Sequence, residues 1–151
     1  MEYQTIIVEE KNAVGYLSLN RPEQFNSFTP QMCLEIVEVL TQWKDDTEIR
    51  IIVIAAIGKA FCAGQAISPD LFGGGAIDLG LVLEKYFNPL LALINTLPKV
   101  IICAVNGVAA GAGASLVLLC DIVIAAKSAS FSQIFSKIGL IPDCGATWLL
   151  P

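Results

Sequence analysis

The 151-residue sequence contains no histidine, which excludes His-dependent catalytic triads and the commonest zinc sites. It has nine lysine and arginine residues against fourteen acidic ones, a formal net charge of −5 and no basic cluster, so it does not predict nucleic-acid binding. Charged residues make up only 15% of the chain and hydrophobic residues 55%, which is more apolar than the usual soluble domain. Burial between subunits or in a membrane would explain this excess.

The cysteines do not form a recognisable metal or disulfide pattern. There are five, at positions 33, 62, 103, 120 and 144, with no C-x-x-C spacing and mostly apolar neighbours. We predict that they are reduced residues that pack in the core. No basic, apolar secretory signal opens the chain, since Glu2, Glu9 and Glu10 lie among the first ten residues, so we expect a cytoplasmic protein.

One segment is a candidate membrane span. Val100 to Cys120 carries no charge, is long enough to cross a bilayer and contains a GxxxG spacing from Gly107 to Gly111. Against this interpretation, Asn106-Gly107 is a strong turn pair in the middle of the segment, and a β-branched run precedes it. We therefore favour a strand, a turn and a helix over a membrane span, and predict no membrane association.

The hydrophobic pattern predicts alternating strands and helices in one domain spanning residues 1–151. Thr29 followed by Pro30 is typical of a helix N-terminus, and this helix is predicted to bury an apolar stripe formed by Met32, Cys33, Ile36, Val37, Leu40 and Trp43. The predicted order is a hairpin of strands 3–9 and 13–19, this helix to about Lys44, a strand at 50–56, a helix at 77–96, a strand at 100–105, a helix at 111–119 and a strand at 121–126. Such alternation indicates the α/β class.

Two strands run directly into glycine-rich turns. The strand at 100–105 leads into Asn106-Gly107 and the closely spaced Gly111 and Gly113, and the strand at 50–56 leads into the segment 58–67. Glycine allows close backbone approach, and the first turn of a helix offers unpaired N–H groups, so these turns can hold an oxyanion. For either turn alone, tight strand–helix packing is the more economical explanation. The three glycines at 73–75 predict a mobile cover over the first turn.

Three segments together resemble the enoyl-CoA hydratase/isomerase (crotonase) superfamily. They are the F-C-A-G motif at 61–64, the A-V-N-G motif at 104–107 with the glycine-rich helix start that follows it, and the tail at 131–148. The tail is most similar to the ring-epoxide acyl-CoA isomerase branch of phenylacetate catabolism. The resemblance implies a ββα superhelical fold, acyl-CoA thioester substrates, no metal or separate cofactor, and assembly as a homotrimer or a dimer of trimers.

The resemblance also assigns residues. It implies oxyanion donors at the backbone N–H groups of Gln65 and Ala112, and contacts to the adenine of CoA from Ala63, Gln65 and Ile67. Asp143 is the acidic residue that stands alone in an apolar run, so burial would raise its pKa and suit it to proton transfer, although a turn-capping role after Pro142 is the alternative. Arg21 and Lys59 are weaker phosphate candidates, and each is better explained as an ordinary solvated charge.

Hydratases of this superfamily use two glutamates, and the matching positions here hold Ser115 and Phe135. We therefore predict an isomerase with a single proton-transferring aspartate. Two further positions depart from the family pattern, at Ala66 and Ala146, and the sequence ends on the apolar run 148–151. These features predict an incompletely represented subunit without the family's C-terminal helical region, and they leave open a non-catalytic acyl-CoA-binding or assembly subunit as the alternative function.

Overall fold

The computed structural model describes residues 2–68 and 78–151. Its strands are β1 (Ile6–Lys11), β2 (Val14–Leu19), β3 (Ile51–Ala56), β4 (Ala60–Cys62), β5 (Val100–Val105), β6 (Val108–Ala110), β7 (Ile122–Ala125) and β8 (Ser130–Ser132). Its helices are η1 (Pro22–Gln24), α1 (Pro30–Asp45), α2 (Leu79–Val82), η3 (Leu83–Phe87), α3 (Asn88–Thr96), α4 (Ala112–Leu119), η4 (Ile134–Ile138) and α5 (Ala146–Leu149). This alternation confirms the predicted α/β class.

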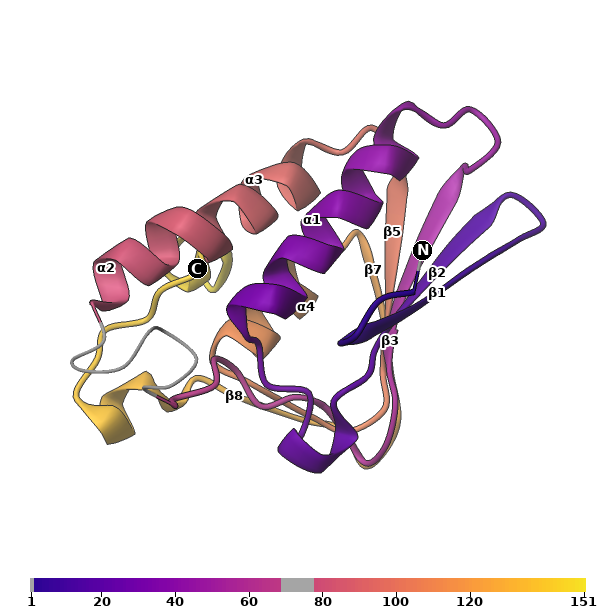
Figure 1. The fold of residues 1–151 in the computed structure, drawn as a ribbon. Coiled ribbons are helices and arrows are strands. Elements are labelled where there is room, and N and C mark those ends of the chain that lie inside the picture. Colours follow the sequence, from indigo (N-terminus) through magenta and orange to yellow (C-terminus); the bar gives the residue numbers. More distant parts are fainter. Residues whose placement is uncertain (1, 69–77) are drawn as a thin grey trace.

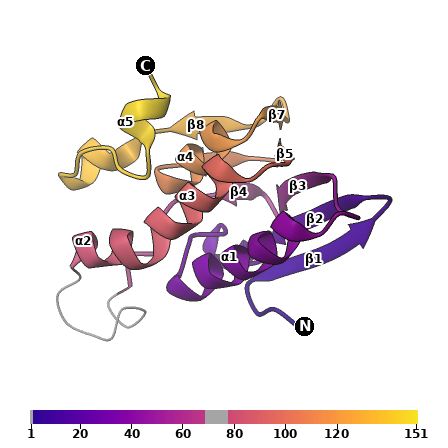
Figure 2. The same cartoon turned by 90° about the horizontal axis from the view of Figure 1, so that it is seen from above.

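The strands form two sheets. The larger sheet has the order β1-β2-β3-β5-β7, in which β1 and β2 make the predicted antiparallel hairpin and the remaining neighbours are parallel. Figure 2 shows the hairpin at one end of the molecule and β7 toward the other. The smaller sheet is parallel and has the order β4-β6-β8. Sequence analysis missed this second sheet, because strands of three residues are too short to show a period.

Helix α1 forms as its sequence predicts. The Thr29 hydroxyl accepts a hydrogen bond from the Met32 N–H at 3.2 Å, and Pro30 occupies the first turn, where no N–H is needed. Its buried face differs from the predicted stripe at three positions: Val37 is only half-buried, whereas Glu35 and Val39 are buried. In Figure 1, α1 runs beside α3 along one face of the larger sheet, and the two helices are in contact.

Glu35 is a buried charge on α1 that the sequence did not single out, and it is only 4% exposed. Its carboxylate accepts hydrogen bonds from the Gln4 N–H at 3.0 Å, the Thr5 N–H at 2.9 Å, the Thr5 hydroxyl and the Gln31 amide at 2.9 Å. The bonds from Gln4 and Thr5 connect the segment before β1 to α1. A buried carboxylate is tolerated here because all its partners are hydrogen-bond donors.

The helix predicted over 77–96 is continuous in space but not uniform. It consists of α2, a π-helical stretch η3 and α3, in that order. Pro89, at the start of α3, has no N–H to donate to the turn before it, and η3 occupies that turn. The loss of one regular hydrogen bond at proline accounts for the departure from α-helical geometry.

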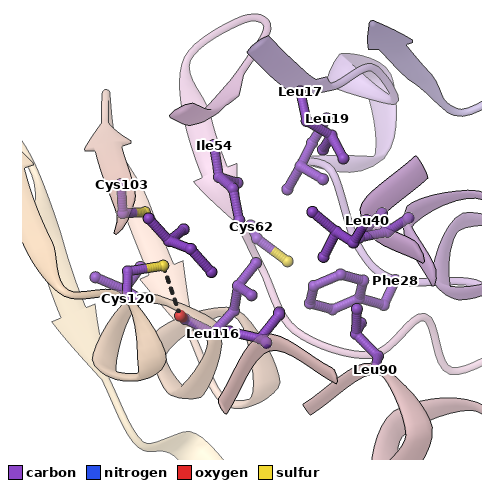
Figure 3. Close-up of a cluster of buried hydrophobic side chains, with 14 of the residues drawn as sticks. Leu17, Leu19, Phe28, Leu40, Ile54, Cys62, Leu90, Cys103, Leu116 and Cys120 are labelled. Atoms are coloured by element: carbon purple, nitrogen blue, oxygen red, sulfur yellow. Dashed lines mark hydrogen bonds between the residues drawn. The ribbon is translucent and has the colours of Figure 1, made fainter. Parts of the chain in front are cut away.

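The core lies between α1, α3, α4 and the larger sheet. Figure 3 shows Cys62 pointing into a cluster that includes Ile54, Phe28 and Leu116. All five cysteines are free and buried, as predicted. The Val100–Cys120 segment is divided between β5, β6 and α4, which overturns the membrane-span alternative for it. Among residues 2–68 and 78–151, we find no helix with the length and apolar character needed to cross a bilayer.

Candidate active site

The two glycine turns that the sequence singled out come together in the structure. Gly64 (φ +99°) and Gly111 (φ +50°) both adopt backbone conformations that disfavour residues with a side chain. A Cβ atom placed on Gly64 would lie 3.0 Å from the Ala110 carbonyl oxygen and 3.7 Å from the Ala112 nitrogen. The segment after β4 therefore lies directly against the start of α4, and only glycine leaves room for this contact.

Both predicted donor N–H groups are left without a backbone partner in the described part of the chain. Phe28 forms a bridge beside Gln65: its N–H donates to the Gly64 carbonyl and its carbonyl accepts from the Ala66 N–H, each at 2.8 Å. The Gln65 N–H belongs to the same peptide group as the Gly64 carbonyl and points the opposite way, because the peptide is trans. It therefore points away from Phe28 and is not used by this pairing. Ala112 is the first residue of α4, where an N–H has no partner within its helix.

A pocket of about 350 Å³ opens at this junction. All five residues predicted for the site line it: Ala63, Gln65, Ile67, Ala112 and Asp143. The rest of the wall is provided by Gly64, Gly111 and the apolar side chains of Leu79, Ile134, Phe135, Ile138 and Leu140. The pocket thus combines two backbone donors and one carboxyl group with a largely apolar wall.

Asp143 is the one acidic residue among the described residues that line the pocket. Burial raises the pKa of its carboxyl group above the ordinary value, and a hydrogen bond with the Cys144 thiol opposes part of that effect. A raised pKa brings a carboxylate closer to the basicity needed to take and return a proton near neutral pH. The Asp143 backbone carbonyl accepts from the Ala146 N–H at 2.9 Å, but any residue at this position could make that bond, so it does not favour the alternative of a turn cap by the aspartate side chain.

Cys144 is next to this carboxyl group but is unsuited to nucleophilic chemistry. Burial raises the pKa of its thiol far above the ordinary value, with the nearby Asp143 carboxylate adding to the effect. Burial likewise raises the pKa of Cys62, at the end of β4, to about 12. Both sulfurs are therefore thiols at neutral pH, which leaves Asp143 as the ionisable group for chemistry in the pocket.

The two cations that were weaker phosphate candidates are not among the residues lining the pocket. The Arg21 guanidinium donates to the Ser27 carbonyl at 2.6 Å, so it closes a local turn. The Lys59 ammonium lies 5.1 Å from the centre of the Phe25 ring, a cation–π contact on the surface. Neither arrangement adds to the evidence for a phosphate contact.

Sequence analysis missed most of the apolar wall. Ile134, Ile138 and Leu140 come from η4 and the turn after it, and Leu79 starts α2. The spacing of Ile134 and Ile138 is the one signal that would have indicated a shared face. The predicted glycine cover at 73–75 lies outside the described residues. Within those residues we find no group of three or more histidine, cysteine or acidic side chains placed to hold a metal ion.

The positions matched to hydratase glutamates present no polar group to the pocket. Ser115 does not line the pocket and is fully buried; its hydroxyl donates back to the Gly111 carbonyl at 3.3 Å. Phe135 does line the pocket and is 6% exposed. Ala146 begins α5 in a fully buried position, and the turn next to Asp143 is formed with this residue in place, since the Ala146 N–H donates to the Asp143 carbonyl.

Comparisons with known proteins agree on one family. The family model for enoyl-CoA hydratase/isomerase matches residues 9–151. The chain is 51% identical over 148 residues to the 1,2-epoxyphenylacetyl-CoA isomerase of Escherichia coli K12, covering 97% of this chain and 56% of that protein. It is 44% identical over 153 residues to a Rhodobacter capsulatus protein named "Probable enoyl-CoA hydratase", covering 100% of this chain and 57% of that protein.

Solved structures give the same result. A crystal structure of an enoyl-CoA hydratase from Polaromonas sp. JS666 superimposes with a TM-score of 0.84 at 35% identity, covering 96% of this chain and 57% of that one. The crotonase-like fold expected from the sequence is therefore confirmed, and the chain spans just over half the length of these relatives. With its two glycine turns converging on one pocket, this chain belongs to the enoyl-CoA hydratase/isomerase family.

Proposed function

We propose that this protein is an acyl-CoA isomerase that moves a double bond, or rearranges a ring epoxide, within an acyl-CoA thioester. The observation that carries the proposal is that Gln65, Ala112 and Asp143 line one pocket, and that the N–H groups of the first two have no backbone partner among the described residues. Similarity to an isomerase and to a protein named as a hydratase is compatible with either reaction. The composition of the pocket favours isomerisation, because its described lining has one acidic residue.

In the proposed reaction the Asp143 carboxylate accepts a proton from C2 of a 3-enoyl-CoA thioester. The electron pair moves into the thioester carbonyl and gives a dienolate, whose oxygen accepts hydrogen bonds from the N–H groups of Gln65 and Ala112. The Asp143 carboxylic acid then returns the proton to C4, so that the double bond shifts from C3=C4 to C2=C3. Every proton is accounted for, and the cycle ends with the carboxylate restored.

The two backbone donors and the Asp143 carboxyl group each lower the energy barrier of the proposed reaction for a physical reason. Two N–H groups held by the backbone need no reorganisation when negative charge develops on the thioester oxygen, and losing one such donor typically costs about 3–4 kcal/mol in the barrier. The raised pKa of Asp143 narrows the gap between its basicity and that of the enolate. We also propose that Ala63, Gln65 and Ile67 contact the adenine of CoA, which their position on the pocket wall supports.

The proposal is tested with purified protein and trans-3-hexenoyl-CoA, by following the ultraviolet absorbance of the conjugated 2-enoyl product. We expect turnover by the wild-type protein and a loss of about 10²-fold or more in kcat for Asp143→Asn, as is typical when a general base is removed. Asp45→Asn is the matched control, because it removes the same charge from an exposed position at the end of α1.

An unchanged rate for Asp143→Asn would remove this residue from the mechanism. Tight acyl-CoA binding by a folded wild-type protein without turnover would favour the alternative role of a non-catalytic acyl-CoA-binding subunit. Light scattering on the same preparation tests the proposed homotrimer or dimer of trimers, and a monomeric mass would contradict it.

A further inference from the structure

Phe135 lines the same pocket as Gln65 and Ala112, and its ring points toward the turn at Gly111. A Cβ atom placed on Gly111 would lie 3.8 Å from the Cζ atom of Phe135, so the tip of the ring lies close to this turn, with room left for little more than one methyl group. Gly111 directly precedes Ala112, whose N–H is one of the donors. The ring is therefore close to the turn whose next N–H group would hold the thioester oxygen in the proposed reaction.

The backbone around Phe135 holds the ring in this place. Its carbonyl accepts a hydrogen bond from the Leu140 N–H at 3.0 Å, which closes the turn through Gly139 (φ +73°). On the other side, the Gly111 N–H donates to the Ser132 carbonyl at 2.9 Å, just before η4 begins. The end of β8, which leads into the helix η4 that carries Phe135, is thus hydrogen-bonded to the turn that carries the donor.

The pocket wall that includes Phe135 is largely apolar. Ile134, Ile138 and Leu140 also line it, and none of their side chains offers a hydrogen bond to water. A water molecule needs two to four polar partners to be held in a cavity. Ser115 is turned back onto the Gly111 carbonyl, and in the proposed reaction the thioester oxygen takes up the Gln65 and Ala112 N–H groups. The polar side chains left among the described residues of the wall are then those of Asp143 and Gln65.

We propose that Phe135 is a specificity-determining residue whose ring keeps water away from the bound thioester, so that the enolate is reprotonated rather than the double bond hydrated. Hydration would require the oxygen of water to bond to C3 and a proton to be delivered to C2. Phe135 takes the space from which that water would approach, and Asp143 is left to exchange protons with carbon. This inference rests on the proposed isomerase function.

The test is a graded series, Phe135→Leu, Phe135→Val and Phe135→Ala, assayed on 3-enoyl-CoA and 2-enoyl-CoA with products separated by mass. We expect the ratio of 3-hydroxyacyl-CoA to isomerised product to rise as the side chain shrinks, by about tenfold or more for the smallest, as for other lost apolar contacts in enzyme pockets. Leucine should keep the wild-type ratio. If the alanine variant does not fold, the product ratio of the valine variant tests the proposal instead.

A second measurement separates failure of this inference from failure of the proposed function. Asp143, whose one titratable hydrogen-bonding neighbour is Cys144, is titrated by carbon NMR with labelled aspartate in each variant. If Phe135 excludes water, its truncation to valine or alanine lowers the pKa of Asp143 towards the ordinary value, and leucine does not.

The two measurements lead to distinct conclusions. Isomerase activity with an unchanged product ratio across the series overturns the role of Phe135 and leaves the isomerase proposal intact. If the wild-type protein does not isomerise at all, the proposed function fails, and an unchanged Asp143 pKa across the series would then also refute the exclusion of water by Phe135.

Discussion

Gly113, in the first turn of α4, lies against the end of β4 and sets the distance between the two proposed donors. A Cβ atom at this position would lie 2.7 Å from the Cβ atom of Cys62 and closer still to its carbonyl oxygen. Carbon atoms in contact are about 3.5–4.0 Å apart, so Gly113→Ala requires α4 and β4 to separate by about 1 Å. Backbone and a buried side chain form the obstacle, so no flexible group can move aside.

This separation should affect both stability and rate. Forcing an extra methyl group into a packed core typically costs about 1–3 kcal/mol, which for a chain of this size lowers the melting temperature by roughly 2–12 °C. Because Gln65 follows β4 by three residues and Ala112 begins α4, the same movement pulls the two donors apart. A misplacement of about 1 Å at a catalytic group can reduce the rate by 10²-fold.

The assay compares thermal unfolding and 3-enoyl-CoA isomerisation for the wild-type protein, Gly113→Ala and Gly80→Ala. Gly80 is exposed in α2, and a Cβ atom there meets only the flexible Asp78 carboxylate, at 3.3 Å, so this control should not lose stability. A Gly113→Ala protein with the wild-type melting temperature and rate would refute the reasoning, because it would mean that α4 and β4 are not in the described contact.

Glu35→Gln should lower the free energy of unfolding at pH 7 by about 1.5–3 kcal/mol, the range for hydrogen bonds to a charged group, as measured by urea denaturation. Burial alone would raise the pKa of Glu35, but hydrogen bonds from Thr5, Gln31 and Gln4 outweigh burial and lower that pKa. The stability contributed by the Glu35 carboxylate is therefore present above its unfolded-state pKa and is lost as the pH falls through its folded-state pKa. A stability difference between wild type and Glu35→Gln that persisted at pH 2 would contradict this. Thr29→Ala should cost about 1 kcal/mol by loss of the N-cap, with Thr29→Ser restoring it in the same experiment. For the wild-type protein, kcat/KM of isomerisation should fall at acid pH with an inflection above the ordinary aspartate value of 3.8, and an inflection at or below that value would argue against Asp143 as the base.

Several parts of the fold could be predicted because their causes are local. Thr29 and Pro30 specify the start of α1 through the bonding needs of a helix terminus, and β-branched runs specify β3 and β5. The features of the fold that the sequence did not predict also have physical reasons. The three-residue strands of the smaller sheet carry no readable period, and the burial of Glu35 depends on donors about 30 residues away.

The sequence by itself determined the α/β class, the family resemblance and which residues were candidates, because glycine turns, caps and an isolated aspartate are properties of short segments. Only the tertiary structure decided that the turns at Gly64 and Gly111 meet, that Asp143 reaches the same pocket, and that Phe135 lies close to the Gly111 turn. The physical reason is that these groups lie up to about eighty residues apart in the chain. Their meeting is fixed by the packing of α4 against β4 and by the pairing of β8 with β6, and neither is encoded in any one segment.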